Sequence, residues 1–196
     1  MPQERLEQIY LKEECSGGGC DFGGYHDPEE IKKKTNLTDA QLRAILKYTL
    51  EEFQNINPGL ASGSLTNPQA AFVRIMDCAL EKIPSQKVTV YRGASRRIPM
   101  APGKVVVFEP YTSTSLDREQ AKTFIRPNGR LMILKVRSAK DISQISNAPT
   151  EKELLLPRGL KFKVESVKQE KMKLDDPEDP RVTRKELIEV VTLSEI

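Results

Sequence analysis

The sequence is poor in the residues that build metal sites and disulfide frameworks. It has one histidine, three cysteines and no tryptophan in 196 residues, and an odd cysteine count does not suggest a disulfide framework. Cys15, Cys20 and His26 lie close together, but their spacing matches no common zinc motif, and a four-ligand site would also need Cys78. We therefore expect no metal. A small disulfide loop between Cys15 and Cys20 stays an alternative.

The chain also lacks long apolar runs and a strong net charge. No stretch approaches the length of a membrane span, and the N-terminus has no apolar run of signal-peptide length. We expect no membrane association and no export through a cleaved signal peptide. Thirty-one Lys and Arg against 28 Asp and Glu give a charge of +3. Acidic residues separate most of the basic ones, which does not favour a nucleic-acid partner.

Residues 1–35 have the pattern of a lead that is separate from the rest of the chain. A short helical pattern over residues 4–14 is followed by glycines between positions 17 and 24, which break any regular element. Asp27-Pro28 then has the pattern of a helix start, with Asp27 as the cap. We therefore predict a partly irregular lead over residues 1–35 and one folded domain over residues 36–196.

Two longer helices are predicted at the start of this domain. Thr38 and Gln41 have the spacing of a capping box, and the helix that follows is expected to end near Pro58. The second helix is expected to begin with Asn67 as its cap and to end before Pro84, because its apolar residues recur at helical spacing.

After Pro84 the apolar pattern changes to that of strands. Runs rich in β-branched residues predict strands at 88–92, 105–108, 131–136, 160–167 and 187–193, with one short helix at 117–124. The charged segment between residues 169 and 184 contains two prolines and is expected to be a surface loop. Helices followed by strands indicate the α+β class.

Three predicted strand ends carry residues suited to a polar ligand. Arg92-Gly93 combines a guanidinium, which binds phosphate well, with a glycine that lets the backbone approach a ligand. The run 113–115, Ser-Thr-Ser, supplies three hydroxyls. Glu151 and Glu153 would project to the same side of an extended strand. Two neighbouring carboxylates repel, so their pKa values separate and they can take different roles.

Taken alone, each pattern has a commoner structural explanation. Arg92 would serve in an ordinary salt bridge, and hydroxyl residues are frequent in plain strands. Spacing alone favours Glu151 and Glu153 as a solvated pair, because exposed charges are common. The order of the three patterns along the chain is what favours a functional site.

Arginine, then Ser-Thr-Ser, then Glu-x-Glu resembles the mono-ADP-ribosyltransferases of the arginine-serine-glutamate class. The resemblance covers residues 36–196 and rests on five ordered segments, at 45–57, 90–93, 113–115, 141–146 and 151–159. It implies an ADP-ribosyltransferase fold, in which N-terminal helices pack on two roughly perpendicular mixed or antiparallel sheets. The resemblance also implies that NAD binds in a cleft between these sheets.

The resemblance implies that Glu153 is the catalytic residue. A fixed carboxylate there would bind the ribose 2′-hydroxyl and stabilise the positive charge of an oxocarbenium-like transition state. By the same resemblance, Ser113 holds Glu153 in place, and Thr114 contributes to NAD binding. Arg92 is expected to contact a phosphate or the nicotinamide ribose, and Gly93 the nicotinamide carboxamide.

The resemblance implies further NAD contacts. Phe124 matches the aromatic residue that packs on the nicotinamide ring, and Arg130 matches a second phosphate-binding arginine. Tyr48 and Asn57 match positions near the adenine and phosphates. Tyr48 and Phe53 are five residues apart, roughly 140° around an α-helix, so these two and Asn57 are not expected to share one narrow face. A core position for Tyr48 therefore stays open.

Glu151 bears on the acceptor. In this family a glutamate at that position goes with arginine as the acceptor, and a carboxylate can both bind a guanidinium and take its proton. We therefore predict an enzyme that transfers ADP-ribose from NAD to an arginine of a target protein and releases nicotinamide. Residues 147–150 lack the aromatic residue that many relatives place before this glutamate.

The chain resembles the bacterial toxin or effector branch of the family, because animal relatives carry a signal peptide and paired cysteines. We expect a secreted effector that acts in the cytosol of a target cell, with a target protein and an immunity or chaperone protein as partners. Two alternatives stay open. One is an NAD glycohydrolase with water as the acceptor, and the other is a catalytically silent binding module on the same fold.

Overall fold

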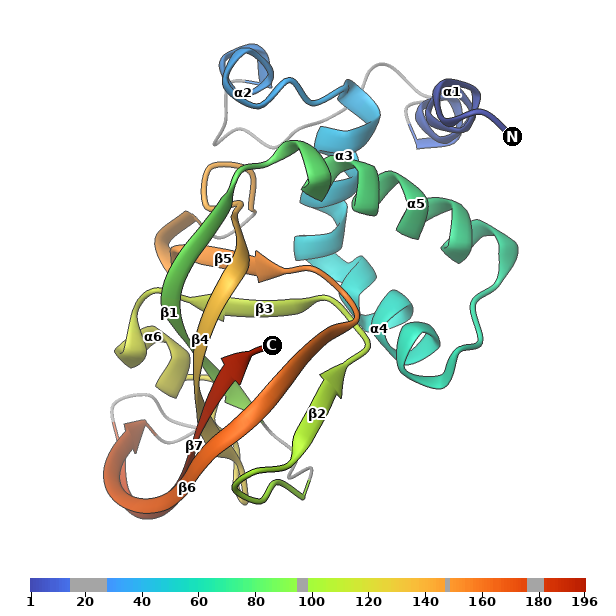
Figure 1. Ribbon diagram of the computed structural model, residues 1–196. Coiled ribbons are helices and arrows are strands. Elements are labelled where there is room, and N and C mark those ends of the chain that lie inside the picture. Colours follow the sequence, from blue (N-terminus) through green and yellow to red (C-terminus); the bar gives the residue numbers. More distant parts are fainter. Residues whose placement is uncertain (15–27, 95–98, 147–148, 176–181) are drawn as a thin grey trace. The chain divides into compact units, whose positions relative to one another are not determined.

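The computed structural model describes residues 1–14, 28–94, 99–146, 149–175 and 182–196 (Figure 1). Helices precede strands, as predicted. The helical elements are α1 (Gln3–Glu14), α2 (Pro28–Thr35), α3 (Asp39–Lys47), η1 (Tyr48–Glu52), α4 (Phe53–Ser62), α5 (Asn67–Lys82), α6 (Arg118–Lys122) and η2 (Pro149–Glu151). The strands are β1 (Ser85–Ala94), β2 (Val105–Phe108), β3 (Thr112–Ser115), β4 (Arg130–Asp141), β5 (Glu153–Leu156), β6 (Leu160–Asp175) and β7 (Thr183–Glu195). The α+β class is confirmed.

The chain divides into two compact units. The helical unit comprises Met1–Pro84 and Lys140–Thr150, and the sheet unit comprises Ser85–Ala139 and Glu151–Ile196. Lys140 ties its segment to the helical unit, because its buried ammonium donates to the carbonyl of Ile83 at 2.7 Å. Burial lowers the pKa of Lys140.

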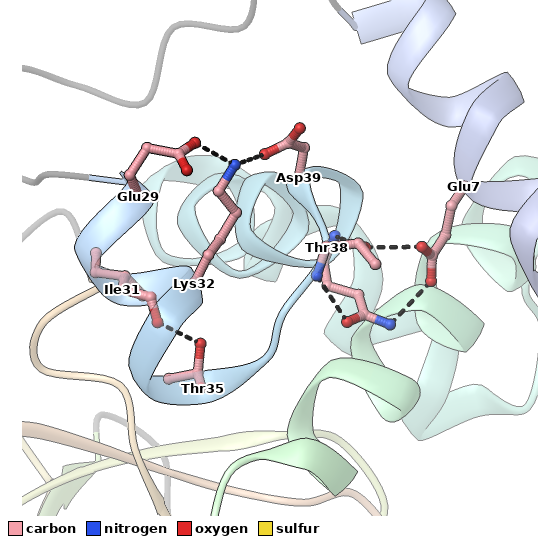
Figure 2. Close-up of polar contacts among 8 residues, drawn as sticks. Glu7, Glu29, Ile31, Lys32, Thr35, Thr38 and Asp39 are labelled. Atoms are coloured by element: carbon pink, nitrogen blue, oxygen red, sulfur yellow. Dashed lines mark hydrogen bonds and ion pairs between the residues drawn. The ribbon is translucent and has the colours of Figure 1, made fainter.

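Helix α1 is part of the helical unit, and the predicted boundary at residue 35 does not separate it. Glu7 is buried and accepts hydrogen bonds from Thr38 Oγ1 at 2.7 Å and Gln41 Nε2 at 2.9 Å (Figure 2). Thr38 caps α3 in the predicted capping box with Gln41. A carboxylate beside a helix N-terminus also interacts favourably with the helix dipole.

Helix α2 is joined to α3 through Lys32. Its ammonium lies 2.8 Å from Asp39 Oδ1 and 2.5 Å from Glu29 Oε1 (Figure 2). The hydrogen bond to Asp39, and to a smaller extent the one to Glu29, raises the pKa of Lys32. Helix α2 begins at Pro28 as expected, whereas its predicted cap, Asp27, lies outside the described residues.

The helix that begins at α3 does not end near Pro58. It passes through the π-helical turn η1, in which the N–H of Phe53 donates to the carbonyl of Tyr48 five residues earlier. Helix α4 then runs through Pro58 and ends at Gly63, whose φ of +67° is the left-handed conformation common at helix ends. The early end predicted from Pro58 was wrong, because a proline inside a helix removes one hydrogen bond without ending the helix here.

The cap of helix α5 also differs from the prediction. Thr66, rather than Asn67, is the N-cap, and its hydroxyl accepts from the N–H of Gln69 while the Gln69 side chain accepts from Thr66 N–H. This reciprocal capping box requires a hydroxyl residue three positions before Gln69, which only Thr66 provides.

The strands form one hydrogen-bonded set of seven, in the order β1-β3-β5-β4-β7-β6-β2, with an additional pairing of β1 with β4. The pair β4–β7 is parallel, and β1–β3, β3–β5, β2–β6 and β6–β7 are antiparallel. The mixed, mostly antiparallel character agrees with the predicted class. The hydrogen bonding links all seven strands rather than leaving two separate sheets.

The loop predicted between residues 169 and 184 was wrong over most of its length. Strand β6 continues to Asp175 and pairs with β7 from Thr183 onward, which makes a long two-stranded ribbon, orange and red in Figure 1. Met172 and Leu174 are buried between charged residues. The period-two pattern is hard to see in the sequence because these two are the only apolar residues between Gln169 and Asp175.

Two buried clusters support the sheet unit. The larger cluster joins β1, β4, β5, β6 and β7. The smaller cluster joins α6 and the residues after it to the β6–β7 ribbon and β4; its buried members are Ala121, Ile125, Leu131, Met172, Leu174, Ile188 and Val190. In the described part of the chain, no helix has both the length and the apolar character needed to cross a membrane.

Candidate active site

The three strand ends that carry the predicted motifs are neighbours in the sheet unit. Strands β1, β3 and β5, which hold Arg92, Ser113 and Glu153, are adjacent in the strand order. Tyr91 pairs with Ser115, and Ser115 pairs with Glu153. Motifs that lie tens of residues apart in the sequence are therefore brought together by strand pairing.

Strand register places the hydroxyl run against the start of β5. Ser115 is the direct partner of Glu153, and Ser113 is the partner of Leu155. Directly opposed residues share a face, so Ser113 is a diagonal neighbour of Glu153 on the same face. This position is compatible with the predicted support of Glu153 by Ser113, which stays a prediction.

Thr114 points to the opposite face from its two serine neighbours. Its side chain is buried, and its Oγ1 donates to the carbonyl of Leu154 at 2.6 Å. This bond fastens β3 to β5. We assign Thr114 to the support of the strand pair, and its predicted contact with NAD gains no support from this placement.

The sequence suggested that the two glutamates lie on one extended strand, but in the structure they do not. Glu151 ends the 3₁₀ turn η2, Lys152 has a φ of +48°, and Glu153 begins β5. The prediction of an extended Glu-Lys-Glu was wrong because pairing of β5 with β3 stops at Glu153. The two carboxylates nevertheless act on each other.

The electrostatics of the pair show this interaction. Glu153 is only 6% exposed, and Glu151 is half-buried. Burial raises the pKa of Glu151, and the negative charge of Glu153 raises that pKa further. A partly desolvated carboxyl therefore lies near a second carboxyl.

Arg92 lies at the same end of the sheet. Its Nη1 donates to the carbonyl of Ser113 at 2.6 Å, and its side chain is half-buried. This bond holds a guanidinium over the β3 strand that pairs with Glu153. The placement is compatible with the predicted phosphate or ribose contact, which stays a prediction.

Gly93 is required by close packing. A Cβ atom built on Gly93 would lie 2.2 Å from the carbonyl oxygen of Ala121 and 3.0 Å from the backbone of Phe124 and Ile125. The segment after α6 therefore packs directly on β1 next to Arg92. This packing brings Phe124, which is 44% exposed, close to the arginine strand.

Arg130 has a different environment from the one predicted. It is 2% exposed, and its Nη2 lies 2.7 Å from Glu189 Oε1, on the adjacent residue of β7. A buried arginine paired with a carboxylate across two strands has a structural role. We therefore drop Arg130 from the candidate NAD ligands. The sequence carried no signal for this pair, because it depends on the register of β4 and β7.

Tyr48 and Asn57 belong to the helical unit. Asn57 Nδ2 donates to the Tyr48 hydroxyl at 3.1 Å, and the rings of Tyr48 and Phe53 are 6.4 Å apart. The π turn brings these three residues together, so the prediction that they cannot share a face was wrong. Tyr48 is 1% exposed and is a core residue, which was the open alternative. The NAD contacts of Tyr48 and Asn57 stay predictions.

Sequence reasoning missed two residues at the Glu151 turn. Ser115 Oγ donates to the carbonyl of Glu151 at 2.7 Å and accepts from the N–H of Asp117 at 3.0 Å. Lys152 adopts a positive φ, for which a lysine in the sequence gives no signal. Ser115 was visible only as the last member of the hydroxyl run.

The described residues contain no group of three or more His, Cys, Asp or Glu side chains arranged to hold a metal. Cys15, Cys20 and His26 lie outside the described residues, so the disulfide alternative is not tested.

Comparison with known sequences gives a consistent assignment. The sequence model of the family described as ADP-ribosyltransferase exoenzyme matches residues 26–192. A protein of Mycobacterium avium (strain 104), provisionally named NAD(+)--arginine ADP-ribosyltransferase Mav, is 33% identical over 134 residues, which are 66% of this chain and 16% of that protein. Exoenzyme T of Pseudomonas aeruginosa is 34% identical over 133 residues, 65% of this chain and 29% of that protein. The chain thus spans less than a third of the length of either relative.

Solved structures share the fold. Exoenzyme S from Pseudomonas aeruginosa, in a complex with human 14-3-3 protein beta and bound to Carba-NAD, has a TM-score of 0.70 at 23% identity. The alignment covers 98% of this chain and 88% of that one. The family match, the fold and the three adjacent motif strands agree with one another, and the chain belongs to the ADP-ribosyltransferase exoenzyme family.

Proposed function

We propose that this chain transfers ADP-ribose from NAD to the guanidinium of an arginine in a target protein and releases nicotinamide. The observation that carries the proposal is the pair of carboxylates at the start of β5, where Glu153 is buried and half-buried Glu151 has a raised pKa. The name of the relative Mav supports arginine as the acceptor, and the Carba-NAD bound to Exoenzyme S supports NAD as the donor.

Glu153 acts on the donor. As the bond between the nicotinamide nitrogen and ribose C1′ breaks, positive charge develops on the ribose. A fixed, buried carboxylate stabilises that charge more strongly than a solvated one does, because water screens it less. Arg92 and Ser113 are proposed to support this step, the first by holding the donor and the second by orienting Glu153.

Glu151 acts on the acceptor. A guanidinium is protonated at any working pH and has no free electron pair to attack C1′. When a guanidinium nitrogen bonds to C1′, it must lose a proton, and Glu151 is proposed to accept it. A raised pKa makes Glu151 a stronger base than an ordinary glutamate.

Phe124 and Gly93 are proposed to contact the nicotinamide end of NAD. Phe124 offers an exposed ring, and its backbone packs on Gly93, the residue after Arg92. Tyr48 and Asn57 are retained as proposed NAD contacts on the basis of the resemblance.

We further propose that the chain acts as an exported effector in the cytosol of a target cell. The description of the family as exoenzymes and the name of Exoenzyme T support export. Its proposed partners are a target protein, which the labelling experiment below identifies, and an immunity or chaperone protein.

The experiment uses labelled NAD with agmatine, a small guanidino compound, as the acceptor. Wild type is expected to release nicotinamide and to form labelled agmatine. Glu151→Gln is expected to keep nicotinamide release and lose agmatine labelling, and Glu153→Gln to lose both. Glu165→Gln, an exposed glutamate of the same unit, is the matched control.

Three outcomes would contradict the proposal. Nicotinamide release by wild type without any labelled agmatine or protein would identify an NAD glycohydrolase. No nicotinamide release and no thermal shift with NAD would identify a silent binding module. Equal agmatine labelling by wild type and Glu151→Gln would exclude Glu151 as the acceptor base. Mass spectrometry of proteins labelled in a cell lysate would then identify the target and acceptor residue.

A further inference from the structure

The backbone between the two glutamates is unusual. Three residues other than glycine have a positive φ in the described part of the chain: Asn36, Asn128 and Lys152. Asparagine tolerates this conformation well, but lysine seldom adopts it. Such a conformation persists only where the surrounding structure imposes it, and it is concentrated at functional sites. Lys152 is therefore the exception that needs an explanation.

Hydrogen bonds from β3 and the residue after it hold both peptide units around Lys152. Ser115 Oγ donates to the carbonyl of Glu151 at 2.7 Å, and Leu116 N–H reaches the carbonyl of Lys152 at 3.5 Å. Glu153 is held by pairing with Ser115. Ser115 is 5% exposed, so its hydroxyl is fixed, whereas the Lys152 side chain is exposed. The backbone conformation of Lys152 is therefore imposed through its neighbours.

This conformation decides where Glu151 lies. In an extended chain, Glu151 would continue β5 and stand on the same face as Glu153. The left-handed residue instead ends the strand and turns the chain into η2. The position of the Glu151 carboxylate relative to Glu153 therefore depends on the backbone angles φ and ψ of Lys152. It also depends on the hydrogen bond that Ser115 donates to the Glu151 carbonyl.

We propose that Lys152, through its left-handed backbone, and Ser115, through its hydroxyl, are positioning residues that direct ADP-ribose to a guanidinium rather than to water. They act by holding Glu151 at the acceptor side of the site while Glu153 stays on β5. The inference rests on the proposed role of Glu151 and adds to it the residues that determine acceptor use.

The test is the ratio of labelled agmatine formed to nicotinamide released. Three variants separate conformation from charge at position 152. Lys152→Val places a β-branched residue where φ is positive and is expected to lower the ratio about tenfold. Lys152→Asn tolerates the conformation and is expected to keep the ratio within about twofold of wild type. Lys152→Gln removes the charge without branching and is expected to behave as Lys152→Asn does.

Ser115 is tested with its own matched set. Ser115→Ala removes the bond to the Glu151 carbonyl and is expected to lower the ratio about tenfold, and Ser115→Thr restores a hydroxyl and should recover it. Ser115 also accepts from the N–H of Asp117, the cap of α6. Asp117→Ala is therefore the control, because it loosens α6 without touching the Glu151 bond and should leave the ratio unchanged.

The outcomes distinguish this inference from the function on which it rests. Wild type that labels no agmatine contradicts the proposed function and, with it, the inference. Wild type that labels agmatine, together with an unchanged ratio in Lys152→Val, overturns the inference alone. A ratio lowered as much by Lys152→Gln as by Lys152→Val would assign the effect to the lysine charge and would also overturn it. A ratio lowered only in Lys152→Val and Ser115→Ala supports the proposal.

Discussion

Two shielded carboxylates of the sheet unit, Glu189 and Glu153, have charged neighbours of opposite sign. Glu189 on β7 faces the guanidinium of Arg130 at 2.7 Å, and these side chains are 17% and 3% exposed. Glu153 on β5 is 6% exposed and lies beside a second carboxylate, Glu151, whose pKa is raised. The first arrangement compensates its charges, and the second brings like charges together.

We interpret the first arrangement as a structural site and the second as the proposed functional site. An ion pair buried between two strands holds β4 and β7 in register, because removing either partner leaves an uncompensated charge. Two neighbouring carboxylates oppose folding at neutral pH, and they are retained where their chemistry is needed. Substitutions at the two sites are therefore expected to change different properties, activity at one and stability at the other.

The largest effect is expected for Glu153→Gln. Nicotinamide release should fall on the order of 10²–10³-fold, because the substitution removes the negative charge that we propose stabilises the transition state. The amide has nearly the shape of the carboxylate and removes the repulsion with Glu151, so the melting temperature should change little. Steady-state kinetics and thermal unfolding measure the two properties. A variant that loses stability and activity together would place Glu153 with Glu189 as a structural residue.

Arg130→Ala is expected to show the reverse pattern. Loss of the guanidinium leaves Glu189 without its ion-pair partner, and the free energy of unfolding should fall by about 3–5 kcal/mol. Chemical denaturation measures this loss, and the KM for NAD of the folded fraction should stay near the wild-type value. Replacing both partners, Arg130→Met with Glu189→Leu, should recover much of the stability. An increased KM for NAD without a loss of stability would restore Arg130 as a phosphate ligand.

Gly93→Ala tests a residue that packs closely on the segment after α6 and is also a proposed contact of NAD. The added methyl group would lie 2.2 Å from the carbonyl oxygen of Ala121, and such overpacking typically lowers the free energy of unfolding by about 1–3 kcal/mol. Because α6 must move, the Phe124 ring should move as well, and the KM for NAD should rise. Unchanged stability and KM would show that the segment after α6 can shift freely and does not set the site.

The smallest effect is expected in the pH dependence of stability for Glu151→Gln. The raised pKa means that the folded state holds the Glu151 proton more tightly than the unfolded state does. Wild-type stability from this group is therefore full below the unfolded pKa of about 4.3 and is lost as pH rises through the folded value. Glu151→Gln should remove that loss.

The corresponding measurement compares melting temperatures at several pH values. The difference between Glu151→Gln and wild type should shift toward greater stability of the variant as pH rises from about 4 to neutral. The exposed control Glu165→Gln should show no such trend. If the difference in melting temperature between Glu151→Gln and wild type is constant with pH, then Glu153 and burial do not raise the pKa of Glu151.

Much of the fold followed from local patterns. The capping box of Thr38 and Gln41, the short helix within residues 117–124 and the strand at Val105–Phe108 all lie where the sequence predicted them. These features depend on residues within a few positions of one another. One failure has a different cause. The continuation of β6 to Asp175 depends on its pairing with β7, which local propensity does not register.

The candidate site shows the same division. The residue types of the arginine, hydroxyl and glutamate motifs, and their order along the chain, indicated the family and the candidate site residues. The left-handed Lys152 and the Ser115 bond to the Glu151 carbonyl were invisible in the sequence, because both arise from the pairing of β3 with β5.

The sequence by itself determined that two carboxylates are available at the start of β5, because this follows from residue identity. It also determined the α+β order of the elements, because helices and strands differ in the period of their apolar residues. Only the tertiary structure decided that Glu153 begins β5 opposite Ser115 and that Arg130 pairs with Glu189. Strand register and burial decide which charges meet, and both are properties of the packed sheet.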